Sequence, residues 1–158
     1  WAALRQAQLN TLSVPNTGMV VAIDLGEWND IHPLNKQDVG KRLAQQAFKL
    51  AYLENKVLLS PIPQRSKFYR EKVEIWFINA EAGLFSKDGA ALKYFEISAD
   101  GSKFFKANAL IKKDKVIIWN EKIKKPTAVR YAWANNPASA NLYPKNGLPA
   151  SPFEIKKE

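Results

Sequence analysis

The residue best able to do chemistry is His32, the single histidine of this 158-residue chain. Asp30 stands two positions before it, Glu27 stands five positions before it, and Pro33 follows directly. An imidazole titrates near neutral pH, so a histidine held on a rigid turn with a carboxylate in reach can act as a general base. A histidine beside a proline can equally hydrogen-bond a backbone carbonyl in a turn. Spacing alone leaves both interpretations open.

The residues that follow His32 predict a loop and then a helix. Pro33 disfavours helical backbone at His32, which places the histidine in the loop. Asn35 is expected to cap the helix, with Asp38 in the first turn. The helical spacing predicts an inward apolar face made of Val39, Leu43, Ala47 and Leu50.

The residues before His32 predict a buried strand. Residues 19–23 are a short apolar run that follows a turn signal at residues 15–18. A strand, a loop with Asp30 and His32, and then a helix is an order typical of open α/β sheets. In such sheets, sites gather at the carboxyl ends of the strands.

The first part of the chain cannot close a core by itself. A first helix is expected over residues 1–12, with Leu4, Ala7 and Leu12 on one side. One strand between two helices needs parallel neighbours, which the chain does not offer. We therefore expect a large apolar face to be exposed unless another piece of polypeptide covers it.

The second part of the chain predicts a β-sandwich, because short β-rich runs alternate with turn signals. Turns are expected at residues 100–101 and 113–115, and an irregular strap at residues 135–153. Charge supports a boundary near residue 55. Residues 1–55 hold 5 Lys+Arg and 5 Asp+Glu, whereas residues 56–158 hold 19 and 10.

Four large side chains in the second part have two interpretations. Trp76, Trp119 and Trp133 lie in strand-like runs beside apolar neighbours, which favours core packing over a carbohydrate platform. Arg130 is expected to pair with an acid or with backbone carbonyls, the alternative being a sugar carboxylate.

Composition excludes several classes of function. The chain has no cysteine and one histidine, which argues against disulfides, thiolate sites and a zinc centre, so no metal or cofactor is expected. The net charge of +9 raises the possibility of nucleic-acid binding, but its lysines lie mostly at expected turns and strand edges, where they discourage aggregation. No apolar run is long enough to span a bilayer. We expect neither nucleic acid nor membrane as a partner.

A series of motifs, in one order along nearly the whole chain, carries a family resemblance. The central motif is Asp30-Ile31-His32-Pro33. The other runs are residues 15–19, 23–26, 35–36 and 39–44 in the first part, and residues 83–89, 92–97, 128–137, 141–143 and 147–153 in the second. Together they resemble the end of the catalytic domain of sialate O-acetylesterases and the sequence after it. These enzymes are SGNH-type serine esterases.

The resemblance implies roles for particular residues. A serine near the start of the family's catalytic domain attacks the acetyl ester, and a histidine near its end, matched by His32, takes the proton. The usual acid position, three residues before the histidine, is occupied by Asn29, so Asp30 is predicted as the orienting acid with Glu27 in reserve. The family's nucleophile motif, Gly-Asp-Ser or Gly-Gln-Ser, is absent, and Ser102 follows a glycine but does not match it.

We therefore predict an α/β plus β fold. Residues 1–55 are expected to be the C-terminal helix-strand-helix piece of a flavodoxin-like SGNH hydrolase domain, and residues 56–158 a small β-sandwich domain. The predicted function is the C-terminal part of a secreted or periplasmic serine esterase that removes O-acetyl groups from carbohydrates, with sialic acid as the expected sugar. Trp28 is expected either to wall the substrate pocket or to pack on the second domain.

The predicted partners are an acetylated carbohydrate and the N-terminal part of the same enzyme, which would supply the serine. Without that serine and the oxyanion donors, this chain alone is expected to be inactive. The alternative from another class is a non-catalytic carbohydrate-binding or interaction module formed by residues 56–158.

Overall fold

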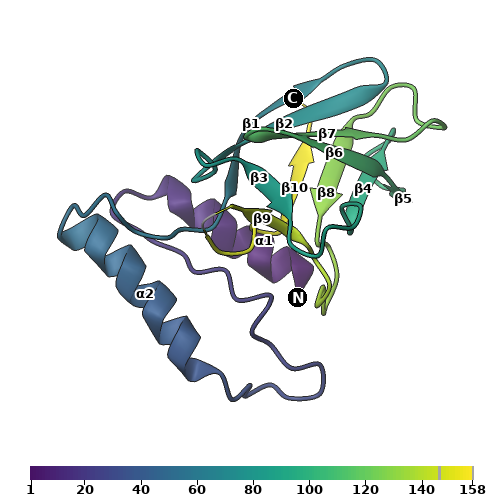
Figure 1. Ribbon diagram of the computed structural model, residues 1–158. Coiled ribbons are helices and arrows are strands. Elements are labelled where there is room, and N and C mark those ends of the chain that lie inside the picture. The colour runs from purple at the N-terminus through teal and green to yellow at the C-terminus, as the bar shows by residue number, and fades with distance from the viewer. Residues whose placement is uncertain (146, 158) are drawn as a thin grey trace.

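The computed structural model describes residues 1–145 and 147–157, which form two α-helices, a short 3-10 helix and ten β-strands (Figure 1). No helix within these residues is both long and apolar enough to cross a membrane. The helices come first, and antiparallel strands follow, as the sequence predicted. The elements are α1 (Ala2–Asn10), η1 (Thr11–Ser13), α2 (Lys36–Ala51), β1 (Ile62–Phe68), β2 (Lys72–Ile78), β3 (Leu84–Ser86), β4 (Phe95–Ser98), β5 (Phe105–Lys106), β6 (Asn108–Lys112), β7 (Lys115–Trp119), β8 (Ala128–Tyr131), β9 (Leu142–Pro144) and β10 (Phe153–Lys156).

Two four-stranded antiparallel sheets make up the body of the fold. Their strand orders are β1-β2-β7-β6 and β10-β8-β4-β5, and β3 and β9 form a separate pair. Side chains of both sheets belong to one core, in which Phe77 of β2 meets Phe153 of β10 edge to face, with ring centroids 6.0 Å apart. Each large apolar side chain buried in such a core contributes about 1.5–3 kcal/mol.

Both predicted turns are present. The chain turns between β6 and β7 at Lys113, whose φ is 59°, and Asp114. In the other turn, Gly101 has a φ of 72°, which a residue without Cβ adopts at no steric cost. The carboxylate of Asp100 accepts the backbone N–H groups of Ser102 and Lys103, both at 2.8 Å, and these bonds lower the pKa of that carboxyl.

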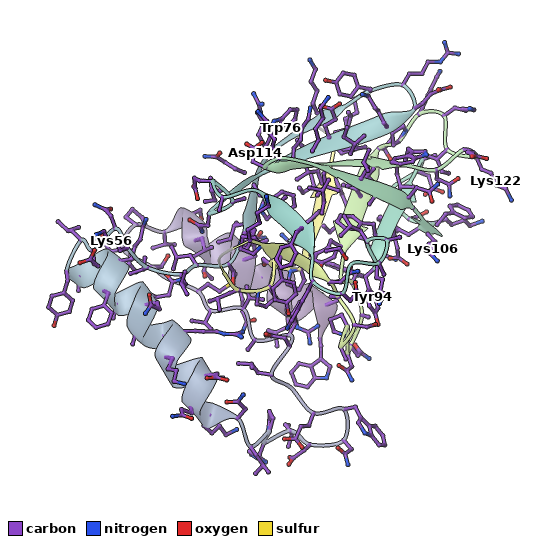
Figure 2. All side chains as sticks on the ribbon, in the orientation of Figure 1. Lys56, Trp76, Tyr94, Lys106, Asp114 and Lys122 are labelled. Carbon is purple, nitrogen blue, oxygen red and sulfur yellow. The ribbon has the colours of Figure 1, made fainter. Side chains whose placement is uncertain are left out.

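The three tryptophans correct the sequence analysis, because none of them belongs to the core. On β2 the inward positions are Val73, Ile75 and Phe77, so strand alternation turns Trp76 to the outer face (Figure 2). Trp119 and Trp133 are likewise only half-buried. A run of apolar residues in a strand does not say which parity faces inward. Here Trp76 and Trp119 occupy outer positions, and Trp133 lies just beyond the end of β8.

The outer face of the first sheet is cationic. Strand register places Arg65, Trp76, Lys115 and Lys112 in one row across all four strands. The Arg65 guanidinium lies 4.1 Å from the Trp76 ring centroid and the Lys115 ammonium 4.8 Å from it, within cation-π range. In the next row, the buried carboxylate of Glu74 pairs with Lys72 at 2.8 Å and Lys115 at 2.6 Å.

The outer face of the second sheet is charge-compensated. Arg130 Nε donates to Glu96 Oε2 at 2.6 Å, and its Nη1 lies 3.8 Å from Glu154 Oε2. The guanidinium also stacks 3.6 Å over the Phe104 ring. Arg130 is therefore the structural partner of acids that the sequence predicted.

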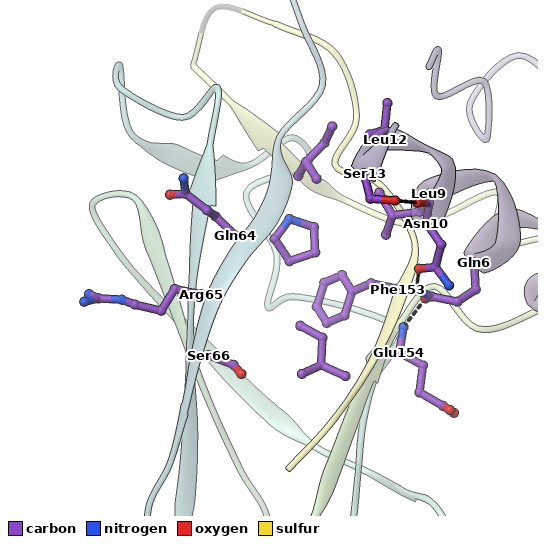
Figure 3. A pocket seen from close by; sticks show the side chains of 13 residues that line it. Gln6, Leu9, Asn10, Leu12, Ser13, Gln64, Arg65, Ser66, Phe153 and Glu154 are labelled. Carbon is purple, nitrogen blue, oxygen red and sulfur yellow. Dashed lines mark hydrogen bonds between the residues drawn. The ribbon is translucent and has the colours of Figure 1, made fainter. Parts of the chain in front are cut away.

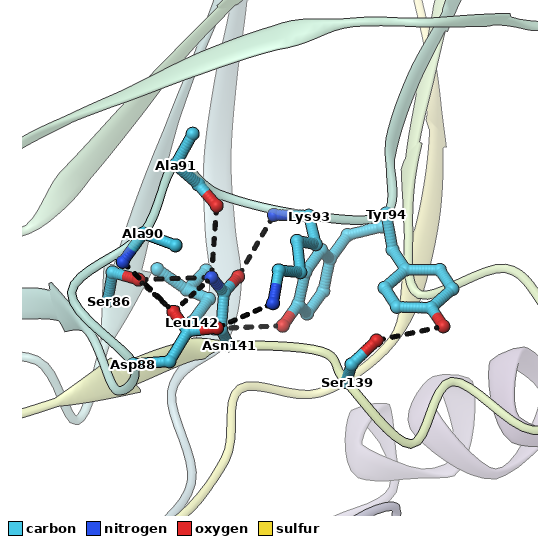
Figure 4. Close-up of polar contacts among 10 residues, drawn as sticks. Ser86, Asp88, Ala90, Ala91, Lys93, Tyr94, Ser139, Asn141 and Leu142 are labelled. Carbon is cyan, nitrogen blue, oxygen red and sulfur yellow. Dashed lines mark hydrogen bonds and ion pairs between the residues drawn. The ribbon is translucent and has the colours of Figure 1, made fainter.

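The strap at residues 135–153 carries β9 and is held by the buried Asn141 (Figure 4). The Asn141 amide donates to Ser86 Oγ at 3.0 Å, Asp88 Oδ1 at 2.8 Å and the Ala91 carbonyl at 3.0 Å, and accepts the Lys93 N–H at 2.9 Å. Residue 146, within the predicted strap, and residue 158, the last of the predicted second domain, lie outside the described residues.

Helix α1 packs on the second sheet, but with a different face from the one predicted. Ala2 is buried and Leu9 contacts the core, and the Gln6 side chain accepts the Glu154 N–H at 2.7 Å. On the predicted apolar side, Leu4 is 50% exposed and Ala7 is exposed, whereas Leu12 is half-buried.

Helix α2 begins as predicted and buries none of its residues. Asn35 Oδ1 accepts the Asp38 N–H at 3.1 Å, which is the expected cap. The face predicted to pack inward is not packed within this chain, with Leu43 at 55% and Leu50 at 39% exposure. In Figure 1 the helix stands apart from the sheets, so the expected apolar surface does exist and has nothing against it in this chain.

Candidate active site

The loop that carries His32 lies between residues 19–25 and α2, and polar side chains of α2 hold its upstream arm. Arg42 forms a bidentate ion pair with Asp24, at 2.7 and 2.8 Å, and its Nη1 also donates to the Val21 carbonyl at 2.6 Å. Gln46 donates to the Met19 carbonyl at 2.8 Å. Because both terminal nitrogens of the planar guanidinium bond to the carboxylate, the pair fixes the orientation of the two groups as well as their separation.

Residues 19–23 correct the helix-strand-helix prediction. The segment pairs with no strand of the described chain and is not itself a β-strand. Val21 is 4% exposed and Ile23 packs on the core, so its apolar residues are partly covered. A backbone forms a strand only where another backbone offers a ladder, and here side chains of α2 take the carbonyls instead.

The loop itself is braced by its own carboxylates. Glu27 Oε1 accepts the Leu34 N–H at 2.9 Å, and Asp30 Oδ1 accepts the His32 N–H at 2.7 Å. An isolated bridge between Glu27 and Asp30 narrows the loop. Both predicted acids thus lie beside His32 and hold the backbone around it.

His32 is exposed, and the described residues give its imidazole no hydrogen-bond partner. The contact between His32 and Asp30 is through the backbone N–H, not through the ring. The structure therefore brings the predicted base and the predicted acid together in one tight turn. The catalytic role of either residue stays a prediction.

A cavity of about 460 Å³ lies against this loop. Its lining comes from loop residues that flank His32, from the strap, and from Trp1 and Arg5 at the start of the chain. Trp28, 83% exposed, is among the lining residues. The lining is Trp1, Arg5, Ala22, Ile23, Gly26, Glu27, Trp28, Asn29, Asp30, Ile31, Pro33, Asn135, Asn136 and Pro137.

Charge links the loop to the strap through Tyr143. Burial raises the pKa of Tyr143 to about 12, and the negative charge of Asp24 adds to the shift. The hydrogen bonds from Arg42 to Asp24 raise the pKa of Arg42 above its ordinary value. The arm that leads to His32 is therefore held by an ion pair beside a neutral phenol.

A larger cavity, about 540 Å³, lies between α1, η1, β1 and β10 (Figure 3). Its polar groups are largely occupied: Gln6 binds the Glu154 N–H, and Ser13 Oγ donates to the Asn10 carbonyl at 2.9 Å. Neither serine of its lining has a histidine beside it. We assign it to imperfect packing of α1 on the sheets.

The chemistry available to the loop is proton transfer. Across the residues that the structure describes, no three His, Cys, Asp or Glu side chains cluster as a metal site would require. An exposed imidazole on a braced loop can take a proton from a hydroxyl that another segment brings to it.

Two features of the site were missed by the sequence analysis. The Arg42 anchor had a signal, since Asp24 directly follows the apolar run, but a helix cation has many possible partners. The approach of Asn135 and Asn136 to the loop had none, because more than a hundred residues separate them from it.

Comparison with solved structures gives a strong likeness over the whole chain. The chain is 40% identical to a carbohydrate acetylesterase from Xanthomonas citri, described as novel, with 100% of this chain covered and a TM-score of 0.92. It spans 37% of the length of that protein. No protein-family model and no curated protein matches it.

This likeness supports the predicted relation to carbohydrate esterases, and the mixed fold of two helices and antiparallel sheets is consistent with it. The sialate specificity and the C-terminal position within a longer enzyme stay predictions.

Proposed function

We propose that this chain is the C-terminal part of a serine esterase that removes O-acetyl groups from carbohydrates. The observation that carries the proposal is the likeness to a carbohydrate acetylesterase over every part of the chain. The exposed His32 on its braced loop also supports the proposal, because its imidazole is placed where it can transfer a proton. The nucleophilic serine comes from sequence outside this chain.

His32 is the general base and acid in this proposal. As the serine oxygen attacks the acetyl carbonyl, His32 takes the serine proton. It then gives that proton to the departing sugar hydroxyl, which leaves an acetyl-serine. In the second half, His32 deprotonates a water, which attacks the acetyl group and releases acetate as the serine regains its proton. Asp30, or Glu27 in reserve, stabilises the imidazolium.

Residues 1–55 are proposed to complete a flavodoxin-like SGNH hydrolase domain. Two features support this: residues 19–23 have no strand partner in the described chain, and apolar side chains of both helices, such as Leu4 of α1 and Leu43 of α2, are exposed. Parallel strands from the remainder of the enzyme would pair with the segment and cover both helices. Residues 56–158 would then be the accessory β-sandwich domain.

The resemblance to sialate O-acetylesterases makes O-acetylated sialic acid the first substrate to test. Acetylated xylan, a polysaccharide, is the second, because the matched acetylesterase is described only as acting on carbohydrate. It also implies a secreted or periplasmic location. Because the nucleophile and oxyanion donors supply most of the acceleration, this chain alone should not release acetate at an enzymatic rate.

The test uses a restored enzyme, in which this chain is joined to the catalytic segments that carry the serine, from the native protein or from the Xanthomonas citri acetylesterase. Acetate release should fall on the order of 10⁴-fold or more in His32→Ala. Gln37→Ala, at an exposed position in the first turn of α2, is the matched control and should keep its activity. Full activity in His32→Ala would overturn the proposal.

A further inference from the structure

The cavity beside the His32 loop has two walls of different origin. Asn29 and Trp28 belong to the loop, whereas Asn136 belongs to the strap that follows β8. Both segments lie toward the lower end of the view in Figure 1. A ligand seated there would contact His32's own turn and the β-rich part of the molecule together.

The strap wall is fixed in place by α1. Arg5 donates to the Ala134 carbonyl at 2.8 Å and to the Asn135 carbonyl at 2.9 Å. The backbone that presents Asn136 is therefore held by a side chain from the first helix, which gives the wall a defined position before any ligand arrives.

The amides of Asn29 and Asn136 are available to a ligand. Neither side chain has a hydrogen-bond partner among the described residues, and both line the cavity. A carboxamide offers one acceptor oxygen and two donor hydrogens, so it can pair with two hydroxyls on neighbouring carbons. Two such amides, one from the loop and one from the strap, suit a polyhydroxylated ring better than an apolar ligand.

The cavity also offers apolar surface. The Trp28 indole is 83% exposed, and Ile23 contributes aliphatic lining. Sugar rings present C–H faces between their hydroxyl edges, and a flat aromatic side chain covers such a face at little entropic cost. Indole, aliphatic carbon and free carboxamide together describe a site for a sugar.

The charges around the cavity favour an uncharged sugar. The one cationic side chain in its lining, Arg5, is already bonded to two carbonyls, while Glu27 and Asp30 place carboxylates on the loop wall. A carboxylated sugar would meet like charge there without a free cation to offset it. A neutral ring meets no such penalty.

We propose that this cavity is the subsite for the sugar that carries the acetyl group, and that Trp28, Asn29 and Asn136 bind an uncharged pyranose there. The inference rests on the proposed esterase function and sharpens it. It makes the strap of the β-rich part a determinant of substrate choice, and it favours acetylated neutral polysaccharides over acetylated sialic acid.

The test compares two substrates in the restored enzyme: an acetylated xylo-oligosaccharide, and p-nitrophenyl acetate, which carries no sugar. In Asn29→Ala and in Asn136→Ala, the ratio of kcat/KM for the oligosaccharide to kcat/KM for p-nitrophenyl acetate should fall about 3- to 10-fold, the size of one lost hydrogen bond. The loss should lie in KM, because the contact is made equally in the ground state.

Asn108→Ala, at an exposed position on β6, is the matched control and should leave the ratio unchanged. Unchanged ratios in both cavity variants, or a kcat/KM for acetylated sialic acid at or above that for the xylo-oligosaccharide, would overturn the inference. If the esterase function itself were wrong, His32→Ala would leave the hydrolysis of both substrates unchanged, which distinguishes that outcome from failure of the subsite. Trp28→Ala adds a third readout that tests the indole wall by the same ratio.

Discussion

At the scale of single residues, Asp30 and Glu27 make the same kind of contact. Each carboxylate accepts one backbone N–H of the loop. Only one of them can be the main partner of the imidazolium during catalysis. Replacement by the matching amide separates the two tasks, because an amide oxygen still accepts the N–H but carries no charge.

In the restored enzyme, Asp30→Asn should lower kcat on the order of 10⁴-fold, as loss of a triad carboxylate does. Glu27→Gln should lower it far less. Steady-state kinetics on p-nitrophenyl acetate measures both. The opposite order would give the orienting role to Glu27, and equal small losses would leave both acids as braces of the loop.

Glu74 gives a pH dependence with a definite sign. Hydrogen bonds from Lys115 and then Lys72 lower the pKa of this carboxyl from 4.5 to about 2. A carboxyl whose pKa is lowered in the folded state stabilises the fold above its unfolded pKa. That contribution is lost as the pH falls through the folded value.

The free energy of unfolding should therefore decline as the pH falls from 4.5 to about 2, and Glu74→Gln should make this part of the decline shallower. Urea denaturation at several pH values measures it. Glu71→Gln is the control, because Glu71 is exposed and its pair with Lys124 is 3.3 Å long. If both variants changed the slope equally, the assignment to Glu74 would fail.

Individual residues were predictable where local chemistry decides. Asn35 as a cap and Arg130 as a partner of acids follow from their own side chains. The position of Trp76 was not predictable in this way, because it depends on which face of β2 meets the other sheet. That choice is made by residues distant in sequence.

At the scale of elements, the strap depends on one buried amide. Asn141 makes four side-chain hydrogen bonds, one to Ser86 at the end of β3 and three to the segment that follows it. Asn141→Ala leaves buried groups without partners and should cost about 2–4 kcal/mol of unfolding free energy. Asn108→Ala, on an exposed face, should change it by no more than about 0.5 kcal/mol.

Urea denaturation of this chain measures both values, and amide hydrogen exchange at Lys93 reports the local effect. Loss of the Asn141 acceptor should speed exchange there in particular. A cost similar to that of the control would mean that the strap is held chiefly by its apolar residues, such as Leu142.

The types of the elements were more predictable than their faces. Helix α1 formed where its periodicity indicated and α2 where its cap and periodicity indicated, yet the face of α2 expected to turn inward is exposed. Periodicity reports that a helix has an apolar side and not that this chain covers it. The same reason explains residues 19–23, whose strand character needs a neighbouring backbone that the sequence does not contain.

At the scale of the whole molecule, the apolar face of α2 should change its role when the remainder of the enzyme is present. In this chain, Leu43→Lys should alter the unfolding free energy by no more than about 0.5 kcal/mol, because the side chain is 55% exposed. In the restored enzyme, the same change should cost about 2–5 kcal/mol, the range for loss of a buried leucine.

Chemical denaturation of the two forms measures the difference, and light scattering should show weaker self-association of the chain alone after the change. Gln37→Lys is the control in both forms. Equal costs in both would mean that no polypeptide covers this face of α2.

The antiparallel second part and its mixture with helices were predictable from short runs and turns. The difference in charge between the outer faces of the two sheets was not predictable, because the charge on a face depends on the register across four strands. That register is set by the hairpin between β6 and β7 and by the long return from β2 to β7.

The unequal charge of these two faces gives the molecule a polarity of its own. Arg65, Lys67 and Lys112 have no acidic partner among the described side chains, while Arg130 opposite them is neutralised by its neighbours. In dilute buffer the protein should therefore adsorb to a sulfonate resin through the cationic outer face of the first sheet. Lys67→Glu with Lys112→Glu should shorten retention more than Lys103→Glu with Lys122→Glu, and about 1 M salt should remove the difference, because the Debye length is then about 3 Å.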